Sequence, residues 1–181
     1  AGQAEAALAD LTTAGELNPR NYQVYNLRGV IYQQQGQLER ALADYSKVID
    51  INPWFAGGYY NRAGIYRARS QFEPALADYN RAIELDPHYA AAYNDRGLVY
   101  QATGRYKPAL ADYDRAVKIN PQYAAAYFNK ALLCRKLGDK DQAIKALRDF
   151  LGSAAADDPG IPIARRGLQG QTGSDLAGRR G

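Results

Sequence analysis

The sequence has very few of the side chains that catalysis and metal binding use most often. Among its 181 residues there is one cysteine, one histidine and no methionine. Cys134 has no second cysteine to pair with, so an internal disulfide is excluded. His88 stands alone and far from Cys134, so the sequence predicts no metal site, no cofactor and no acid–base centre built on histidine. We therefore expect a protein that is not an enzyme.

Long apolar runs and a strong net charge are also missing. No apolar run approaches the roughly 18 residues that a membrane-spanning helix needs. The net charge is +4, and the segment 161–181, with four arginines and one aspartate, supplies most of it. The rest of the chain is nearly neutral and lacks the basic stripe that a nucleic-acid partner would normally require. Nucleic acid is therefore not an expected partner, and the sequence leaves the cellular compartment open.

Repetition is what the sequence has in abundance. Four prolines recur at one constant interval: Pro19, Pro53, Pro87 and Pro121. When position 1 is set at residues 22, 56, 90 and 124, the copies agree in size and type at several further positions. Position 4 is Tyr25, Tyr59, Tyr93 and Tyr127; position 8 is Gly29, Ala63, Gly97 and Ala131; position 20 is Ala41, Ala75, Ala109 and Ala143. Such a period decides the architecture before any other feature.

The spacing within one copy predicts two helices. Positions 4, 8 and 11 share one face of a helix with 3.6 residues per turn, and positions 20, 24 and 27 share one face of a second helix. Gly36 and Gly104 mark the tight turn between them. The recurring proline ends the second helix, because the residue before a proline disfavours the helical conformation. Helices of about 13 residues are marginal alone, so each hairpin needs a neighbour to cover its apolar face.

These residues carry a resemblance to the tetratricopeptide repeat (TPR), whose 34-residue signature has aromatic, small and proline positions at these offsets. The wording "YNRAG…ALADYNRAIELDP" is most similar to bacterial members. The resemblance implies an all-α fold, a right-handed superhelical solenoid of antiparallel helix hairpins. The predicted divisions are the second helix of an incomplete repeat (1–21), repeats at 22–55, 56–89 and 90–123, a degenerate C-terminal repeat (124–157), a capping helix (158–170) and a disordered basic tail (171–181).

The first residues align with the middle of a repeat. Gly2 corresponds to Gly36 and Ala7 to Ala41, so the first helix of that repeat is not in the sequence. A lone second helix would expose an apolar face. We therefore expect this helix to come from sequence further towards the N-terminus or from a partner.

Charged residues recur with the same period. Aspartate occupies position 23 in the incomplete repeat and the next three, and a basic residue occupies position 7 in the four full repeats. Pairing each basic residue with the aspartate of the preceding repeat closes four pairs: Asp10–Arg28, Asp44–Arg62, Asp78–Arg96 and Asp112–Lys130. We predict that these pairs form an ion-pair ladder between repeats. The alternative is a set of exposed charges that contribute little to stability.

The family resemblance also implies a concave groove lined by the first helices. The candidate groove residues are Asn26, Tyr60, Asn61, Arg67, Asn94, Asp95, Phe128, Asn129 and Arg135. The amides of Asn61 and Asn129 can donate and accept hydrogen bonds at once, which suits the backbone of an extended peptide. The two aromatic side chains would be apolar anchors, and the two arginines would meet an acidic group. Position 5 has no lysine, so capture of Hsp70 or Hsp90 tails is not expected.

Three functions fit this pattern. The first is a protein–protein interaction scaffold that binds a peptide segment or partner protein in the groove. The second is an assembly subunit that docks another protein, or a second copy, through the convex face or the open N-terminal helix with Leu8, Leu11 and Ala14. The third is an accessory region of a larger enzyme. Loss of binding on changing groove residues favours the first function, and sensitivity at the N-terminal helix favours the second.

Overall fold

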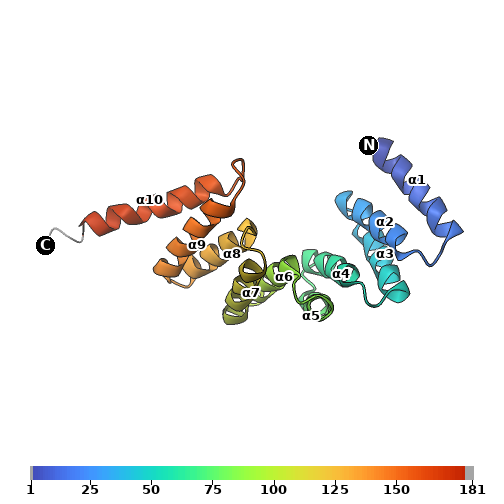
Figure 1. Cartoon of the computed structure of the whole chain (residues 1–181), viewed down its shortest axis with the longest axis horizontal. Helices are drawn as coiled ribbons and strands as arrows, with labels where there is room; N and C mark the ends of the chain where they lie inside the picture. Colours follow the sequence, from blue (N-terminus) through green and yellow to red (C-terminus); the bar gives the residue numbers. More distant parts are fainter. Residues whose placement is uncertain (1, 178–181) are drawn as a thin grey trace. The chain divides into compact units, whose positions relative to one another are not determined.

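The structure is a computed structural model that describes the backbone of residues 2–177 and the side chains up to Gln169. Within that range the chain forms ten α-helices and no strand, which confirms the all-α prediction (Figure 1). The helices are α1 (Gly2–Leu17), α2 (Tyr22–Gln34), α3 (Leu38–Ile51), α4 (Ala56–Ala68), α5 (Phe72–Leu85), α6 (Ala90–Ala102), α7 (Tyr106–Ile119), α8 (Ala124–Lys136), α9 (Lys140–Ser153) and α10 (Ile161–Ala177).

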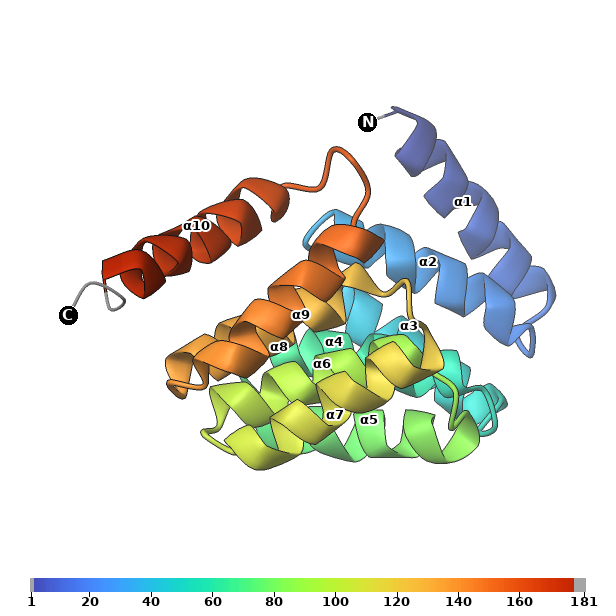
Figure 2. The ribbon, with the colours of Figure 1, turned by 60° about the vertical axis from the view of Figure 1, so that its left-hand side comes forward.

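The helices gather into two compact units, Ala1–Ala92 and Tyr93–Gly181. In the first unit α2 pairs with α3 and α4 with α5, while α1 packs on α2 and α3 on α4. In the second unit α8 pairs with α9, and α7 and α10 pack on this hairpin from its two sides (Figure 2). The hairpins α2–α3 and α8–α9 are therefore each covered by the next helix along the chain, α4 and α10 respectively, as the marginal length of their helices requires.

The turn between the two helices of a hairpin uses a left-handed residue. Gly36, Gly104 and Gly138 have φ values of 72°, 75° and 82°, and Ser70 takes the same place with φ 57°. A Cβ on Gly36 or Gly104 would meet nothing within 4 Å, so backbone conformation rather than space selects glycine there. The predicted turns at Gly36 and Gly104 are confirmed.

The junction between repeats is an Asx turn, which the proline period alone does not predict. The residue before each recurring proline is Asn or Asp, and its side chain accepts a hydrogen bond from the backbone N–H two residues further on. The four bonds are Arg20 N to Asn18 Oδ1, Trp54 N to Asn52 Oδ1, His88 N to Asp86 Oδ1 and Gln122 N to Asn120 Oδ1. The side chain of His88 is exposed in its turn.

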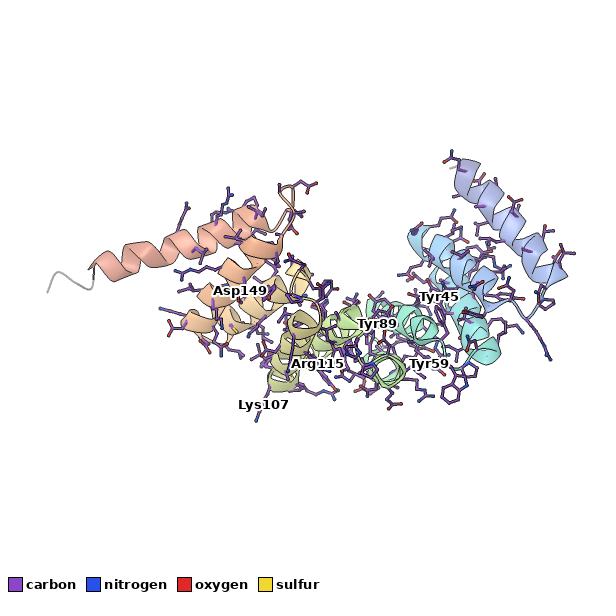
Figure 3. The ribbon with its side chains drawn as sticks, in the orientation of Figure 1. Tyr45, Tyr59, Tyr89, Lys107, Arg115 and Asp149 are labelled. Atoms are coloured by element: carbon purple, nitrogen blue, oxygen red, sulfur yellow. The ribbon has the colours of Figure 1, made fainter. Side chains whose placement is uncertain are left out.

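In the first and third hairpins the core contains a tyrosine ring packed on a glycine. A Cβ on Gly29 would lie 2.7 Å from Cε1 of Tyr45, which is why position 8 is small. The ring of Tyr45, labelled in Figure 3, is fully buried, and its hydroxyl donates to Gln33 Oε1 at 2.9 Å. Burial, reinforced by the charge of Asp44, raises the pKa of Tyr45 to about 12. Gly97 and Tyr113 repeat this contact at the same distance.

The inter-repeat ion-pair ladder is wrong in its pairing. Each arginine binds the aspartate of its own repeat through two hydrogen bonds of 2.7–2.9 Å, giving the pairs Arg28–Asp44, Arg62–Asp78 and Arg96–Asp112. Positions 7 and 23 face each other within one antiparallel hairpin, so the guanidinium edge meets the carboxylate directly. Asp10 lies exposed on α1, outside this arrangement.

A connection between repeats does exist, but it uses position 25. Nη1 of Arg28 donates to Thr12 Oγ1 and Nη1 of Arg62 donates to Ser46 Oγ, each at 3.3 Å. In the last repeat Ala146 replaces the aspartate, and Lys130 pairs instead with Asp114 of the preceding repeat at 2.5 Å. The basic residue therefore does join neighbouring hairpins, through a partner that the sequence reading missed.

The ends of the chain differ in how they are covered. On α1 only Gly15 is buried, whereas the second helices α3, α5, α7 and α9 each bury their positions 20, 24 and 27. At the other end α10 buries Ala164 against Leu147 and Phe150. The helix continues to Ala177, so the predicted disorder of 171–177 is wrong, and residues 178–181 lie outside the described range.

Candidate functional site

The predicted groove residues lie on the first helices of the hairpins, and asparagine amides join neighbouring first helices. In the first unit Nδ2 of Asn61 on α4 donates to Oδ1 of Asn26 on α2 at 2.9 Å. In the second unit Nδ2 of Asn129 on α8 donates to Oδ1 of Asn94 on α6, also at 2.9 Å. The same amide couple, between positions 5 and 6 of successive repeats, is therefore built twice.

The members of a couple differ in how far a ligand can reach them. Asn61 and Asn129 are half-buried, and each uses one amide hydrogen in its couple. An asparagine amide has two donor hydrogens and an acceptor oxygen, so capacity for a ligand is left on both. Asn94 is 3% exposed and donates to Asp95 Oδ1 at 2.9 Å, so its predicted role as a groove contact is wrong. Its role is to hold Asn129 in place.

The two predicted aromatic anchors take part in packing. The ring of Tyr60 lies 5.9 Å from that of Tyr79 and 4.7 Å from that of Tyr89, whose position is labelled in Figure 3. The ring of Phe128 lies 5.1 Å from that of Phe150. Both side chains are half-buried, so part of each ring is exposed on the face of its first helix.

The predicted charged contacts lie in different surroundings. Arg67 is half-buried in the last turn of α4, whereas Arg135 is exposed in the last turn of α8. Arg135 borders an apolar hollow that Leu132, Ile144, Leu147 and Ile163 also line. Asp95 is half-buried beside the amide of Asn94, and its charge adds to the burial that raises the pKa of Tyr123.

The arginines at position 7 are structural rather than ligand-binding. The guanidinium of Arg28 lies over the rings of Tyr25 and Tyr32, at 5.4 and 5.9 Å from their centroids. The hydrogen bond to Asp44, more than the opposing effect of burial, raises the pKa of Arg28, so its charge is permanent. Arg62 and Arg96 have equivalent tyrosine neighbours. Each of these side chains binds the aspartate of its own hairpin through two hydrogen bonds.

Chemistry-bearing clusters are scarce in the part of the chain that the structure describes. No three His, Cys, Asp or Glu side chains in residues 2–169 come together as a metal site would require. Over residues 2–177, no helix is long and apolar enough to cross a membrane. Cys134 is buried, and burial raises the pKa of its thiol, which favours the unreactive protonated form.

Comparisons with known families agree with the repeat geometry. The sequence matches a tetratricopeptide repeat model at residues 22–55 and 90–123, a second tetratricopeptide repeat model at 112–145 and a TPR repeat model at 63–104. The chain is a tetratricopeptide repeat protein. Two of the TPR matches begin and end where predicted repeats do. No curated protein matches the sequence.

Solved TPR structures have the same fold. The crystal structure of MamA is 25% identical with a TM-score of 0.76, over 84% of this chain and 89% of MamA. TTC0263, a thermophilic TPR protein of Thermus thermophilus, is 23% identical with a TM-score of 0.77, over 93% and 92%, and shows the fold alone. The first TPR domain of Spaghetti (RPAP3), bound to the HSP90 peptide SRMEEVD, is 28% identical with a TM-score of 0.62, over 65% and 93%.

Proposed function

We propose that this TPR protein is a non-enzymatic scaffold that binds an extended segment of a partner protein on the face formed by its first helices. The observation that carries the proposal is the repeated amide couple, Asn61 with Asn26 and Asn129 with Asn94. Each couple holds one asparagine in a fixed orientation, with acceptor and donor capacity left for another group.

A peptide backbone is the ligand that fits such amides. It presents one N–H and one C=O per residue whatever its sequence, so a fixed asparagine can accept from the first and donate to the second. Because the couple already orders the side chain, less conformational entropy is lost when the ligand binds. The half-buried rings of Tyr60 and Phe128 add apolar contact area beside the two amides.

The Spaghetti structure supports this use of the fold, since that protein holds a peptide. The resemblance does not extend to the same partner. Position 5 of the full repeats is Asn26, Tyr60, Asn94 and Phe128, and none of these is the lysine expected of a clamp for a terminal carboxylate. We propose recognition of an internal extended segment instead.

The proposal is tested by affinity capture with the intact chain and with an Asn61→Ala/Asn129→Ala variant as baits, followed by mass spectrometry of the bound proteins. A partner captured by the intact chain and lost from the variant, at a temperature where both have the same circular dichroism spectrum, supports groove binding. A partner held equally by both baits contradicts it.

A second candidate function has its own observation in α1. Leu11 and Ala14 are only half-buried, whereas the matching positions of the other second helices are buried. Leu8 is half-buried, as Leu42, Leu110 and Ile144 are at the matching position. If the chain assembles with a second copy through this face, Leu8→Glu/Leu11→Glu should lower the molar mass measured by light scattering. If the face binds another protein, the same variant should abolish capture of that protein while the groove residues are unchanged. The partner would then be bound by α1 rather than by the asparagines.

A further inference from the structure

An apolar hollow lies at the α8–α9–α10 end of the second unit. Its wall is apolar and formed by Leu132, Ile144, Leu147 and Ile163, with Arg135 and Lys140 at its edge. Its volume is about 30 Å³, and it is open to solvent on one side. An apolar hollow with a few polar groups at its rim is the usual form of a binding site.

The rest of the chain shows what normally fills this place. Leu147 occupies the same position of its repeat as Tyr113, and Arg135 occupies the same position as Gln101. In the preceding hairpin the buried ring of Tyr113 fills the space, and its hydroxyl donates to Gln101 Oε1 at 3.0 Å. Tyr45 and Gln33 repeat the arrangement at 2.9 Å. The last hairpin therefore lacks the phenol ring that the others contain.

A second side chain is missing at the same point. Gly167 on α10 lies one full period after Leu133, which is fully buried in the preceding repeat. A Cβ on Gly167 would lie 3.0 Å from Leu147 Cδ1, so even alanine would crowd the hollow. The space thus results from two smaller side chains that meet at one contact. Leucine stands in place of tyrosine at position 147, and glycine stands in place of leucine at position 167.

The edge of the hollow favours an anionic or hydroxyl-bearing group. Arg135 and Lys140 are both exposed, and neither forms an ion pair within residues 2–169. The nearby Asp139 is engaged as the N-cap of α9, where it accepts from Gln142 N at 3.0 Å. Arg135 stands where Gln101 stands in the preceding repeat, and its guanidinium can only donate hydrogen bonds. The group that it binds therefore has to accept a hydrogen bond.

We infer that this hollow binds a tyrosine side chain of a partner segment that has an acidic residue next to the tyrosine. The ring packs on the apolar wall from the open side of the hollow, because Leu147 itself occupies the place of Tyr113, and its hydroxyl accepts from the Arg135 guanidinium. The adjacent carboxylate pairs with Lys140. The inference rests on the proposed function, because Arg135 belongs to the groove surface, and it names the chemistry of one residue of the partner.

The test is a titration of the ¹⁵N-labelled intact chain with acetyl-Gly-Tyr-Glu-Gly-amide, followed by NMR. We expect shifts confined to residues 131–147 and 161–168, with a dissociation constant on the order of 1 mM, as suits a single anchor. Replacing tyrosine by leucine, or glutamate by lysine, in the peptide should each weaken binding at least tenfold. Absent shifts, or shifts elsewhere in the chain, overturn the inference.

Two variants and one control variant make the test specific. Leu147→Tyr/Arg135→Gln rebuilds the internal pair of Tyr113 and Gln101, so it should melt at a higher temperature and lose peptide binding. Arg135→Gln alone, at an exposed position, should fold normally and bind at least tenfold more weakly. Arg148→Gln, which removes a charge from the exposed face of α9, should bind as the unchanged chain does. Equal binding of the peptide by all three variants contradicts the inference. The groove proposal is not affected by that result, because its test depends on Asn61 and Asn129 alone.

Discussion

Arg28 and Asp44 are joined by two parallel hydrogen bonds, Nε to Oδ2 at 2.8 Å and Nη2 to Oδ1 at 2.7 Å, across the two helices of one hairpin. The Asp44 side chain is 7% exposed and that of Arg28 is 18% exposed. The pair is therefore largely removed from water, and each partner depends on the other for its neutralisation.

Removing one member of this pair should be strongly destabilising. We expect Asp44→Ala to lower the free energy of unfolding by about 3 kcal/mol, because it leaves a buried guanidinium without its carboxylate. Asp10→Ala changes the matching position of α1, where the side chain is exposed, and should change stability by less than about 0.5 kcal/mol. Urea denaturation of both variants, followed by circular dichroism, measures the difference. Equal losses would instead support a pairing of Arg28 with Asp10.

Two glycines in first helices should respond to alanine in opposite directions. A Cβ at position 29 would lie 2.7 Å from the fully buried ring of Tyr45, so Gly29→Ala should destabilise the chain by about 1–3 kcal/mol. A Cβ on Gly64 would meet nothing within 4 Å, so Gly64→Ala should stabilise by about 0.5–1 kcal/mol through helix propensity. Thermal melting of the two variants gives the signs, and a stabilising Gly29→Ala would contradict the close packing of the hairpin.

The buried tyrosines predict a loss of stability at alkaline pH. Burial raises the pKa of Tyr45 to about 12 in the folded chain, whereas an exposed phenol titrates near 10. Because the folded pKa is the higher one, the contribution is fully present below about pH 10 and is lost as the pH rises towards 12. The loss for Tyr45 alone is about 3 kcal/mol. Urea denaturation between pH 8 and 11.5 measures the larger part of this loss, which is complete only above pH 12.

The matched control for this pH dependence is Tyr45→Phe, which keeps the ring and removes the ionisable hydroxyl. Its unfolding free energy should fall less steeply above pH 10 than that of the unchanged chain. Parallel curves for the two proteins would show that Tyr45 titrates normally and is not enclosed as described.

Cys134 should be unreactive in the folded chain. It is 2% exposed, and burial raises the pKa of its thiol, so both access and thiolate formation are suppressed. We expect its modification by Ellman's reagent at pH 8 to be at least a hundredfold slower in the native chain than in urea. A comparable rate in both conditions would place the thiol on the surface.

The sequence predicted the fold well because the fold depends on residue types that recur at one period. Gly36 and Gly104 lie at the predicted turns, and Ala41 and Tyr45 lie in the predicted core. The pairing of Arg28 was not predictable in the same way. The repeat places one aspartate before each arginine and another after it, at nearly equal separations along the chain. Only the antiparallel geometry of the hairpin selects the aspartate that follows the arginine.

The site was predicted less well, because burial depends on contacts between repeats. Asn94 and Asn129 occupy similar polar positions in sequence, yet one is enclosed and the other is half-buried. The hydrogen bond between them joins position 5 of one repeat to position 6 of the next, so the aligned repeats do not show it. The length of α10 was also missed, since glycine and serine after Gly170 weaken a helix without ending it, and no proline follows Pro162.

The measurement that tests the central claim most directly compares Asn129→Ala with Asn94→Ala for binding of a captured partner segment. Both variants remove the same hydrogen bond, but only Asn129 is open to a ligand. Isothermal titration calorimetry at a temperature where both variants are folded should show at least tenfold weaker binding for Asn129→Ala and a smaller loss for Asn94→Ala. Unchanged binding by Asn129→Ala, or equal losses in the two variants, would contradict a groove in which the asparagine amide holds the partner.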